Sequence, residues 1–333
     1  MPKPKRALFA VFVLFASLSS ASTPAIGQGG AEQPSAPGNY LERRLSSALR
    51  GKDEAGLDEI RRELSSRDSA RQRRLAELLK SEDAEVQEFA AGLLAEEGTV
   101  ASVSSLVEAI RGEQKVTARA NLMTILGNVS TSASLPALVE CATDLSDLSL
   151  HRCCRDALSA TRDPAALGEL LNIIEAAAPS AQVEPLRYAV CHVRDENLIP
   201  TLVARTESTD NDIVRICAQG LVNIGTNDAL RALFKLIGER PGHAVAEVAE
   251  RVLIQHAWET REGALIGICA EVLSSDSNFR QARTALECLV PMASQEATEV
   301  LEERFSRDPA GELRPYLAGA LSRHRKIRSG SPK

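Results

Sequence analysis

The stretch Val214–Ile237, VRICAQGLVNIGTNDALRALFKLI, places two apolar halves on either side of a short polar break. In each half, apolar side chains recur every three or four residues, which puts them on one face of a helix. Gly225 suits the end of a helix, and Asn227 or Asp228 can cap the start of the next one. The stretch therefore predicts two helices joined by a tight turn, an αα-hairpin.

The same pattern recurs along the chain with a spacing of about 30–35 residues, a period typical of solenoids. Small residues occupy equivalent places in the first helix of successive units: Ala90, Ala120, Cys154, Ala218 and Ala249. Residues 182–206 form a shortened copy between two of these units. One such hairpin cannot bury its apolar face alone, so it needs a neighbour on each side. The pattern predicts an all-α fold, an α-solenoid of helical hairpins over residues 84–324.

The two ends of this repeat differ from its interior. Residues 40–83 are more charged and are predicted to be N-terminal capping helices, and residues 325–333 are predicted to be a basic C-terminal tail. Aromatic residues make up only 3% of the chain. The scarcity of aromatic side chains favours helix over sheet. It also removes the stacking platforms on which binding of single-stranded nucleic acid depends.

The N-terminal segment has the features of a targeting signal. Lys3, Lys5 and Arg6 precede an apolar run that ends in small residues near Ala21, which predicts a secretory signal peptide over residues 1–21. The apolar run is shorter than the roughly 20 residues of a membrane-spanning helix, although an uncleaved anchor is the alternative. Residues 22–39 hold three prolines and four glycines and are predicted to be a flexible linker. We expect a periplasmic or secreted protein, associated with the membrane only if the signal segment is retained.

The charge of the chain limits its partners. Removal of residues 1–21 takes away three positive charges and no acid, so the formal charge changes from -6 to -9. An exported acidic protein is a poor candidate for binding nucleic acid or an anionic membrane surface. We therefore expect protein partners and no nucleic acid.

Residues 210–237 resemble the short bacterial HEAT-like repeat that is named after phycobilisome lyases. The matching positions are Asp212, Val214, Arg215, Ala218, Ile224, Gly225, Ala229, Leu233 and Ile237. The resemblance covers residues 84–322, and the other copies are more degenerate. It implies a right-handed superhelix that serves as a scaffold for protein binding more often than as a catalyst. In such superhelices the second helix of each hairpin lines the concave groove, which implies that Glu169, Arg231, Lys235 and Glu299 are exposed there.

No motif for catalysis or for cofactor binding is present in the sequence. The five histidines, His151, His192, His243, His256 and His324, lie in separate units without metal-ligand spacing. None of them precedes a glutamate, as the iron ligands of some helical-repeat hydroxylases do, so we interpret them as isolated surface or turn residues. Motifs for nucleophiles, phosphate loops and dinucleotides are absent. We expect no catalytic residue, no metal and no cofactor.

These features favour an exported, non-enzymatic HEAT-repeat scaffold that mediates protein–protein interaction. One alternative is an enzyme or enzyme subunit similar to the lyase branch of the family, which would need polar groups gathered in the groove. The other alternative is a structural protein tethered to the membrane by an uncleaved N-terminal segment.

Seven cysteines are present, and none forms a C-x-x-C pair. Cys153 and Cys217 occupy equivalent places beside the small residues of their units, which favours a role as apolar filler in the core. Alternatively, Cys141 at the end of one unit forms a disulfide with Cys153 or Cys154 of the next helix, which export would permit. Because the number is odd, at least one thiol is unpaired or intermolecular.

Trp258 is the single tryptophan and is predicted to lie in a turn between helices, within HAWETRE. Packing would explain it, but tryptophan is enriched at binding hot spots, so Trp258 is also a candidate interaction residue. The units depart most from the regular pattern at Trp258, at Cys153–Cys154 and in the short copy over residues 182–206. These are the places where binding specificity is expected.

Overall fold

The computed structural model describes residues 37–64, 69–129, 131–177, 182–239, 244–260, 263–275, 278–307 and 311–330. Within these residues the chain forms eighteen α-helices, two short 3₁₀ helices and no strand. The predicted all-α solenoid is thereby confirmed. The predicted signal peptide and most of the predicted linker lie outside the described residues.

Seven hairpins follow one another along the chain. They are α4 (Ala84–Glu97) with α5 (Val100–Gly112), α6 (Val116–Leu126) with α7 (Leu135–Thr143), α8 (Leu148–Ser159) with α9 (Pro164–Ala176), α10 (Glu184–Cys191) with α11 (Ile199–Arg205), α12 (Asn211–Ile224) with α13 (Asn227–Glu239), α14 (Ala244–Thr260) with α15 (Gly263–Ser274), and α16 (Phe279–Leu289) with α17 (Gln295–Arg307). Three helices precede them, α1 (Pro37–Gly51), α2 (Glu54–Glu63) and α3 (Ser69–Leu78), and α18 (Arg314–Arg328) follows. The 3₁₀ helices η1 (Ser132–Ser134) and η2 (Glu196–Leu198) lead into α7 and α11.

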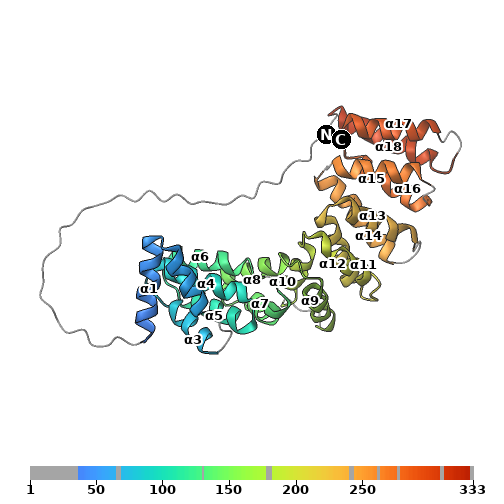
Figure 1. Cartoon of the computed structure of the whole chain (residues 1–333). Coiled ribbons are helices and arrows are strands. Elements are labelled where there is room, and N and C mark those ends of the chain that lie inside the picture. The colour runs from blue at the N-terminus through green and yellow to red at the C-terminus, as the bar shows by residue number, and fades with distance from the viewer. Residues whose placement is uncertain are drawn as a thin grey trace, which may run out of the picture.

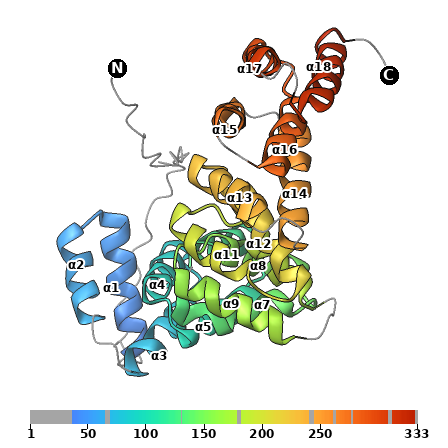
Figure 2. The same ribbon diagram turned by 90° about the vertical axis from the view of Figure 1, so that its right-hand side faces the viewer.

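The helices stack in two layers. The first helices of the hairpins pack in sequence, from α4 through α6, α8, α10, α12, α14 and α16 to α18. Most of the second helices contact their counterparts in the next unit, and one hydrophobic core extends from Leu41 to Leu321. Figure 1 shows the stack as two arms, with α1–α10 along one direction and α12–α18 along another. The change of direction falls beside the short unit of α10 and α11. Figure 2 looks along the first arm and shows the second arm rising above it.

The hairpin of residues 214–237 shows how the sequence specifies the turn. Helix α12 ends at Gly225, whose φ of 66° is left-handed and whose N–H donates to the carbonyl of Leu221. Glycine adopts this conformation without the steric cost that a Cβ brings. The residue that caps the next helix differs from the prediction. The N–H of Ala229 donates a hydrogen bond to the hydroxyl oxygen of Thr226 at 3.4 Å. Asn227 and Asp228 instead lie in the first turn of α13.

Two boundaries also differ from those predicted. Helix α1 begins at Pro37, three residues inside the predicted linker, and proline suits a first helical turn because its missing N–H is not needed there. At the other end, α18 continues to Arg328, so Arg325–Arg328 are helical rather than part of a tail. Their positive charges lie in the last turn, where cations are favoured by the helix dipole.

Asp83 joins α1 to the start of α4 and should make this junction sensitive to acid. Its carboxylate caps α4 and accepts hydrogen bonds from Ser46 Oγ at 2.7 Å and from Arg50 at 3.0 Å. The hydrogen bond from Ser46, followed by the other donors, lowers the pKa of Asp83. A lowered folded-state pKa gives stability that is present above the unfolded pKa of about 4 and is lost as the pH falls through the folded value.

We therefore expect Asp83→Ala to lower the free energy of unfolding by about 1 kcal/mol at pH 7, the usual value of a helix cap. Asp83→Asn keeps the cap but removes the charge, so its melting temperature should fall less than that of the wild type between pH 7 and pH 3. Thermal melts of the three proteins at both pH values measure this. An equal acid loss in wild type and Asp83→Asn would contradict the role given to the carboxylate.

Candidate interaction surface

The short unit brings side chains of three helices together beside the change of direction. Helices α10 and α11 have only 8 and 7 residues, and each carries a proline in its first turn. An open groove of about 550 Å³ lies over α8, α10 and α12 at this place. Among the residues that line it are Leu145, His151, Arg155, Tyr188, His192 and Arg215. Leu145 is among the exposed large hydrophobic side chains, so the groove offers an apolar contact as well as charges.

Three planar side chains are stacked at the rim of this groove. The guanidinium carbon of Arg155 lies 3.9 Å from the centroid of the Tyr188 ring. The ring of His192 lies 3.7 Å from that of Tyr188, with 16° between the two planes. His192 Nδ1 is also 2.8 Å from the carbonyl oxygen of Tyr188. Cation–π and stacking contacts on both sides of its ring restrict Tyr188, which is 39% exposed.

A second open groove, of about 520 Å³, shares Tyr188 and His192 with the first and includes Arg162, Arg194 and Asp195. The lining of the two grooves contains five arginines, Arg155, Arg162, Arg187, Arg194 and Arg215, and three acids, Asp156, Glu184 and Asp195. We call the exposed or half-buried residues Arg155, Tyr188, His192, Arg194 and Arg215 the bend surface. It is locally basic on a chain whose formal charge is -6.

The arginines around the bend surface differ in how they are paired. Arg187 is mostly buried and lies 2.8 Å from Glu184 and 3.4 Å from Asp212. Arg155 contacts Asp156 at 2.6 Å, whereas Arg215 is 3.7 Å from Asp212. Within the described part of the chain, Arg194 makes no ion pair. The surface thus combines fixed cations with at least one cation that is available to a partner.

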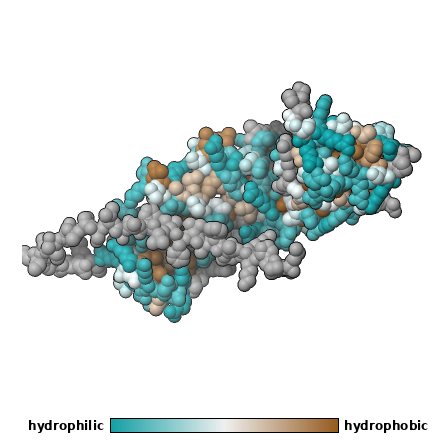
Figure 3. Space-filling view, turned by 90° about the horizontal axis from the view of Figure 1, so that it is seen from above, coloured by the Kyte–Doolittle hydropathy of each residue, from teal (hydrophilic) through white to brown (hydrophobic). Residues whose placement is uncertain are grey.

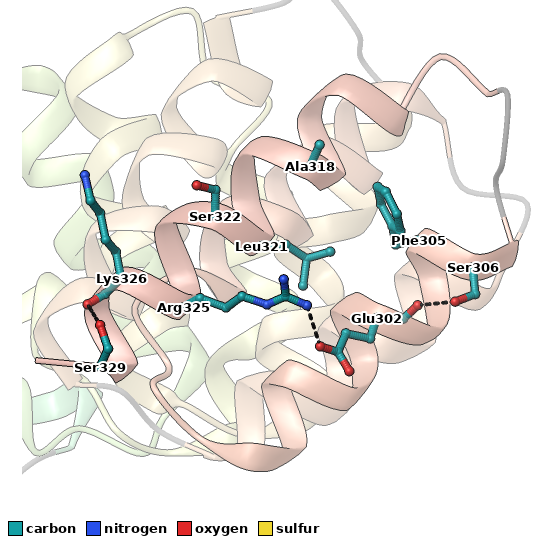
Figure 4. Close-up of a pocket in the computed structure, with 9 residues that line it drawn as sticks. All are labelled: Glu302, Phe305, Ser306, Ala318, Leu321, Ser322, Arg325, Lys326 and Ser329. Carbon is teal, nitrogen blue, oxygen red and sulfur yellow. Dashed lines mark hydrogen bonds and ion pairs between the residues drawn. The ribbon is translucent and has the colours of Figure 1, made fainter. Parts of the chain in front are cut away.

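A third groove, of about 840 Å³, lies between the last two helices (Figure 4). Phe305, Ala318 and Leu321 form its apolar part, and Arg325 reaches across it to Glu302 at 2.8 Å. Among the described residues, α17 and α18 are the last two helices, and no further unit packs over this groove. A groove of this kind is expected wherever a helical unit has a neighbour on one side only.

The four charged residues placed by analogy in a concave groove are exposed but scattered. Glu169, Arg231, Lys235 and Glu299 lie on α9, α13 and α17, and none of them lines the three grooves described above. Arg231 pairs with Glu271 at 2.8 Å, Lys235 lies 3.6 Å from Glu239, and Glu299 accepts from Gln295 at 2.9 Å. Exposed pairs of this kind contribute little to stability. The structure does not bring these four residues into one site.

Trp258 does not lie in a turn, contrary to the prediction. Helix α14 continues to Thr260, so Trp258 is in its last turn and is 41% exposed. The polar residues Glu259 and Thr260 at this helix end suggested a loop, although nothing in them stops a helix. Trp258 lies on a different unit from the bend surface.

Cys141 is joined to Cys154 by a disulfide, with 5.9 Å between the Cα atoms. Of the two partners left open by the sequence, Cys153 is the one that remains free. Its Sγ donates to the carbonyl of Met123 at 3.0 Å, and burial raises its pKa to about 11. Burial likewise raises the pKa of Cys191 to about 11 and that of Cys217 to about 12. Such thiols are poor nucleophiles at neutral pH, so they offer no catalytic group.

The histidines are less isolated than the sequence suggests. His256 and His324 are buried, and His324 contacts the Thr298 hydroxyl at 2.9 Å and the carbonyl oxygen of Val290 at 3.2 Å. His151 and His192 line the same groove, and His243 is outside the described residues. The described ranges contain no group of three potential metal ligands. They also contain no helix that is long and apolar enough to cross a membrane.

Sequence reasoning did not name Arg155 or Tyr188, and it named His192 only as an isolated surface or turn histidine. The only available signal was indirect, since the short copy over residues 182–206 marks a departure from the repeat. Arg155 belongs to the preceding regular unit, and its contact with Tyr188 depends on how closely α8 and α10 pack.

Comparisons with known proteins give no family. No protein-family model and no curated protein sequence matches the chain. Among solved structures, an engineered protein matches with 18% identity over 86% of this chain and 88% of its own, at a TM-score of 0.26. The YibA protein of Escherichia coli matches with 12% identity over 89% and 100%, also at 0.26. The complex of CpcE and CpcF of phycocyanin lyase from Nostoc sp. PCC7120 matches with 16% identity over 75% and 93%, at 0.23. TM-scores this low assign the chain to no family.

Proposed function

We propose that this chain is an exported, non-enzymatic scaffold of HEAT-like repeats that binds a protein partner through the bend surface. The stack of Arg155, Tyr188 and His192 on an open groove carries the proposal. Tyrosine and arginine are enriched at binding hot spots, where rigid side chains lose little conformational entropy on association. A partner contacting Tyr188 would also meet the exposed Leu145, which adds apolar area to the contact.

The charge of the bend surface indicates the kind of protein that it would bind. Arg194 has no ion pair within the described residues, and Arg215 lies at a long 3.7 Å from its acid. Carboxylates of a partner can therefore approach both guanidinium groups without displacing a short ion pair. Arginine binds carboxylates with two parallel hydrogen bonds, which fixes orientation as well as affinity. We infer a partner that presents acidic side chains beside an apolar one.

Two features support export. The N-terminal sequence has the charged, apolar and small-residue regions of a signal peptide in the right order. The disulfide between Cys141 and Cys154 is of the kind that persists in oxidising compartments.

The bend surface also favours binding over catalysis. The thiols near it, those of Cys191 and Cys217, are mostly or fully buried and have raised pKa values.

The test uses the full chain, expressed with its own N-terminal segment, as bait in the exported fraction of its host. We expect the recovered bait to lack Met1–Ala21 and to retain a partner. Tyr188→Ala and Arg155→Ala should each reduce the retained partner by roughly tenfold or more, as hot-spot truncations do. Quantitative mass spectrometry of the eluates measures the reduction.

Arg231→Ala is the matched control, because Arg231 is also an exposed, ion-paired arginine but lies away from the bend surface. It should retain the partner as the wild type does. Circular dichroism spectra establish that all variants are folded. Equal retention by Tyr188→Ala and wild type would contradict binding at the bend surface, and no retained protein above background would contradict the scaffold function.

A further inference from the structure

Two of the remaining cysteines are in direct contact inside the second arm. Cys269 of α15 and Cys288 of α16 are hydrogen-bonded through their thiols. Both side chains are 0% exposed, and the two helices pack against each other. Their thiols therefore lie next to each other inside the core.

This pair repeats the arrangement of the disulfide in the first arm. Cys141 and Cys154 join the second helix of one hairpin, α7, to the first helix of the next, α8. Cys269 and Cys288 relate α15 to α16 in the same way. Cys141 and Cys269 are both the seventh residue of their helices, and Cys288 lies about one turn further along α16 than Cys154 does along α8. The same junction of the repeat thus carries a cysteine pair in each arm.

We propose that Cys269 and Cys288 form a second disulfide, which links two successive units of the second arm as Cys141 and Cys154 link two units of the first. The reaction is thiol–disulfide exchange with a small or protein disulfide as oxidant. One thiolate attacks the oxidant and expels one thiol, and the second thiolate then attacks the mixed disulfide and expels the other. Two cysteine thiols and one disulfide become one cystine and two thiols, so atoms and electrons balance.

Burial determines when this bond can form. The hydrogen bond from Cys269 and burial together raise the pKa of the Cys288 thiol well above its usual value. The folded, reduced pair therefore holds almost no thiolate, and no oxidant can reach it. The bond must form during folding, before α15 and α16 have closed over the two sulfurs. In the folded protein, the packing of α15 against α16 keeps the two cysteine side chains next to each other.

The test is oxidative refolding of the full chain. The reduced, unfolded protein is refolded with a mixture of glutathione and glutathione disulfide, and the remaining thiols are alkylated under denaturing conditions. With the Cys141–Cys154 bond alone, five cysteines are alkylated, namely those that are free in the structure. With the second bond, the seven cysteines less two pairs leave three.

Trypsin separates the two cysteines, because residues 262–280 and 284–304 are released as different peptides. We expect these two peptides to be linked before reduction and separate after it. The proposal is overturned if both peptides are fully alkylated while the Cys141 peptide is linked, or if either cysteine is linked to Cys191 or Cys217 instead.

Two variants complete the test. Cys288→Ala should leave four alkylated cysteines, whereas Cys153→Ala, which removes a thiol without a thiol partner, should leave two. The wild-type peptide map decides the question even if Cys288→Ala does not fold. The experiment is independent of the binding function, since it is performed on the isolated protein.

Discussion

Replacing Gly220 with alanine is expected to lower the free energy of unfolding by about 1–2 kcal/mol. A Cβ at this position of α12 would lie 2.9 Å from the backbone oxygen of Val190 and 3.3 Å from Cδ1 of Leu202. The nearest atom belongs to the backbone of α10, so it cannot rotate away. Overpacking of this kind costs about 1–3 kcal/mol, and the preference of helices for alanine offsets about 0.5–1 kcal/mol of it. Urea unfolding of the variant and the wild type measures the difference.

Gly92→Ala is the matched control for this prediction. Gly92 also lies inside a helix, α4, but a Cβ there would meet no atom within 4 Å. Alanine should therefore stabilise the protein at this position by about 0.5–1 kcal/mol. If Gly220→Ala lowers the free energy of unfolding and Gly92→Ala raises it, the close approach of α12 to α10 determines the effect. The same sign for both would contradict the contact between Gly220 and Val190.

Loss of the disulfide between Cys141 and Cys154 is expected to have the larger effect. The two cysteines are 13 residues apart, and a loop of about that length gives about 3 kcal/mol of stabilisation in the chain-entropy description. We therefore expect the double variant Cys141→Ala with Cys154→Ala to melt roughly 6–12 °C lower in the transition that reports on the first arm. Differential scanning calorimetry under non-reducing conditions measures this shift.

Cys153→Ala separates the two possible partners of Cys141. Cys153 and Cys154 are adjacent and leave trypsin digestion in the same short peptide, so peptide mapping alone does not distinguish them. In Cys153→Ala the Cys141 peptide should still be linked, and the melting temperature should still fall on addition of a reductant. In the double variant the reductant should have no effect on this transition. A Cys153→Ala protein that lacks the link would overturn the assignment.

The helices could be predicted because they depend on the spacing of residues that are close together in the sequence. An apolar residue at every third or fourth position, with Gly225 after the last one, produces the same hairpin wherever neighbouring units cover it. The caps were less predictable, since Thr226, Asn227 and Asp228 are all good capping residues and only the backbone path selects Thr226. Trp258 was placed wrongly because polar residues at a helix end resemble a loop. The full length of α14 depends on its packing against α12 and α16.

The bend surface could not be derived from the sequence for a different reason. Arg155 and Tyr188 are in contact because two first helices of successive units pack side by side. The repeat predicts that these helices are neighbours, but not which side chains on their outer faces meet. Arg231 and Lys235 are exposed and form local ion pairs, which the analogy with other superhelices does not predict. On the face shown in Figure 3, most of the coloured residues are hydrophilic and the hydrophobic ones are scattered among them, so hydropathy alone does not single out a site there.

The position of the disulfide has a consequence for how the protein comes apart. In a solenoid each unit contacts only its neighbours, so unfolding can start at one end and proceed unit by unit. The bond between α7 and α8 ties one unit to the next rather than the two helices of one unit to each other. Fraying that starts at α18 would meet the proposed bond between α15 and α16 first, and the bond between α7 and α8 would be the next covalent link that it reaches. We expect this second link to hold the junction of α7 and α8 together after the second arm has unfolded.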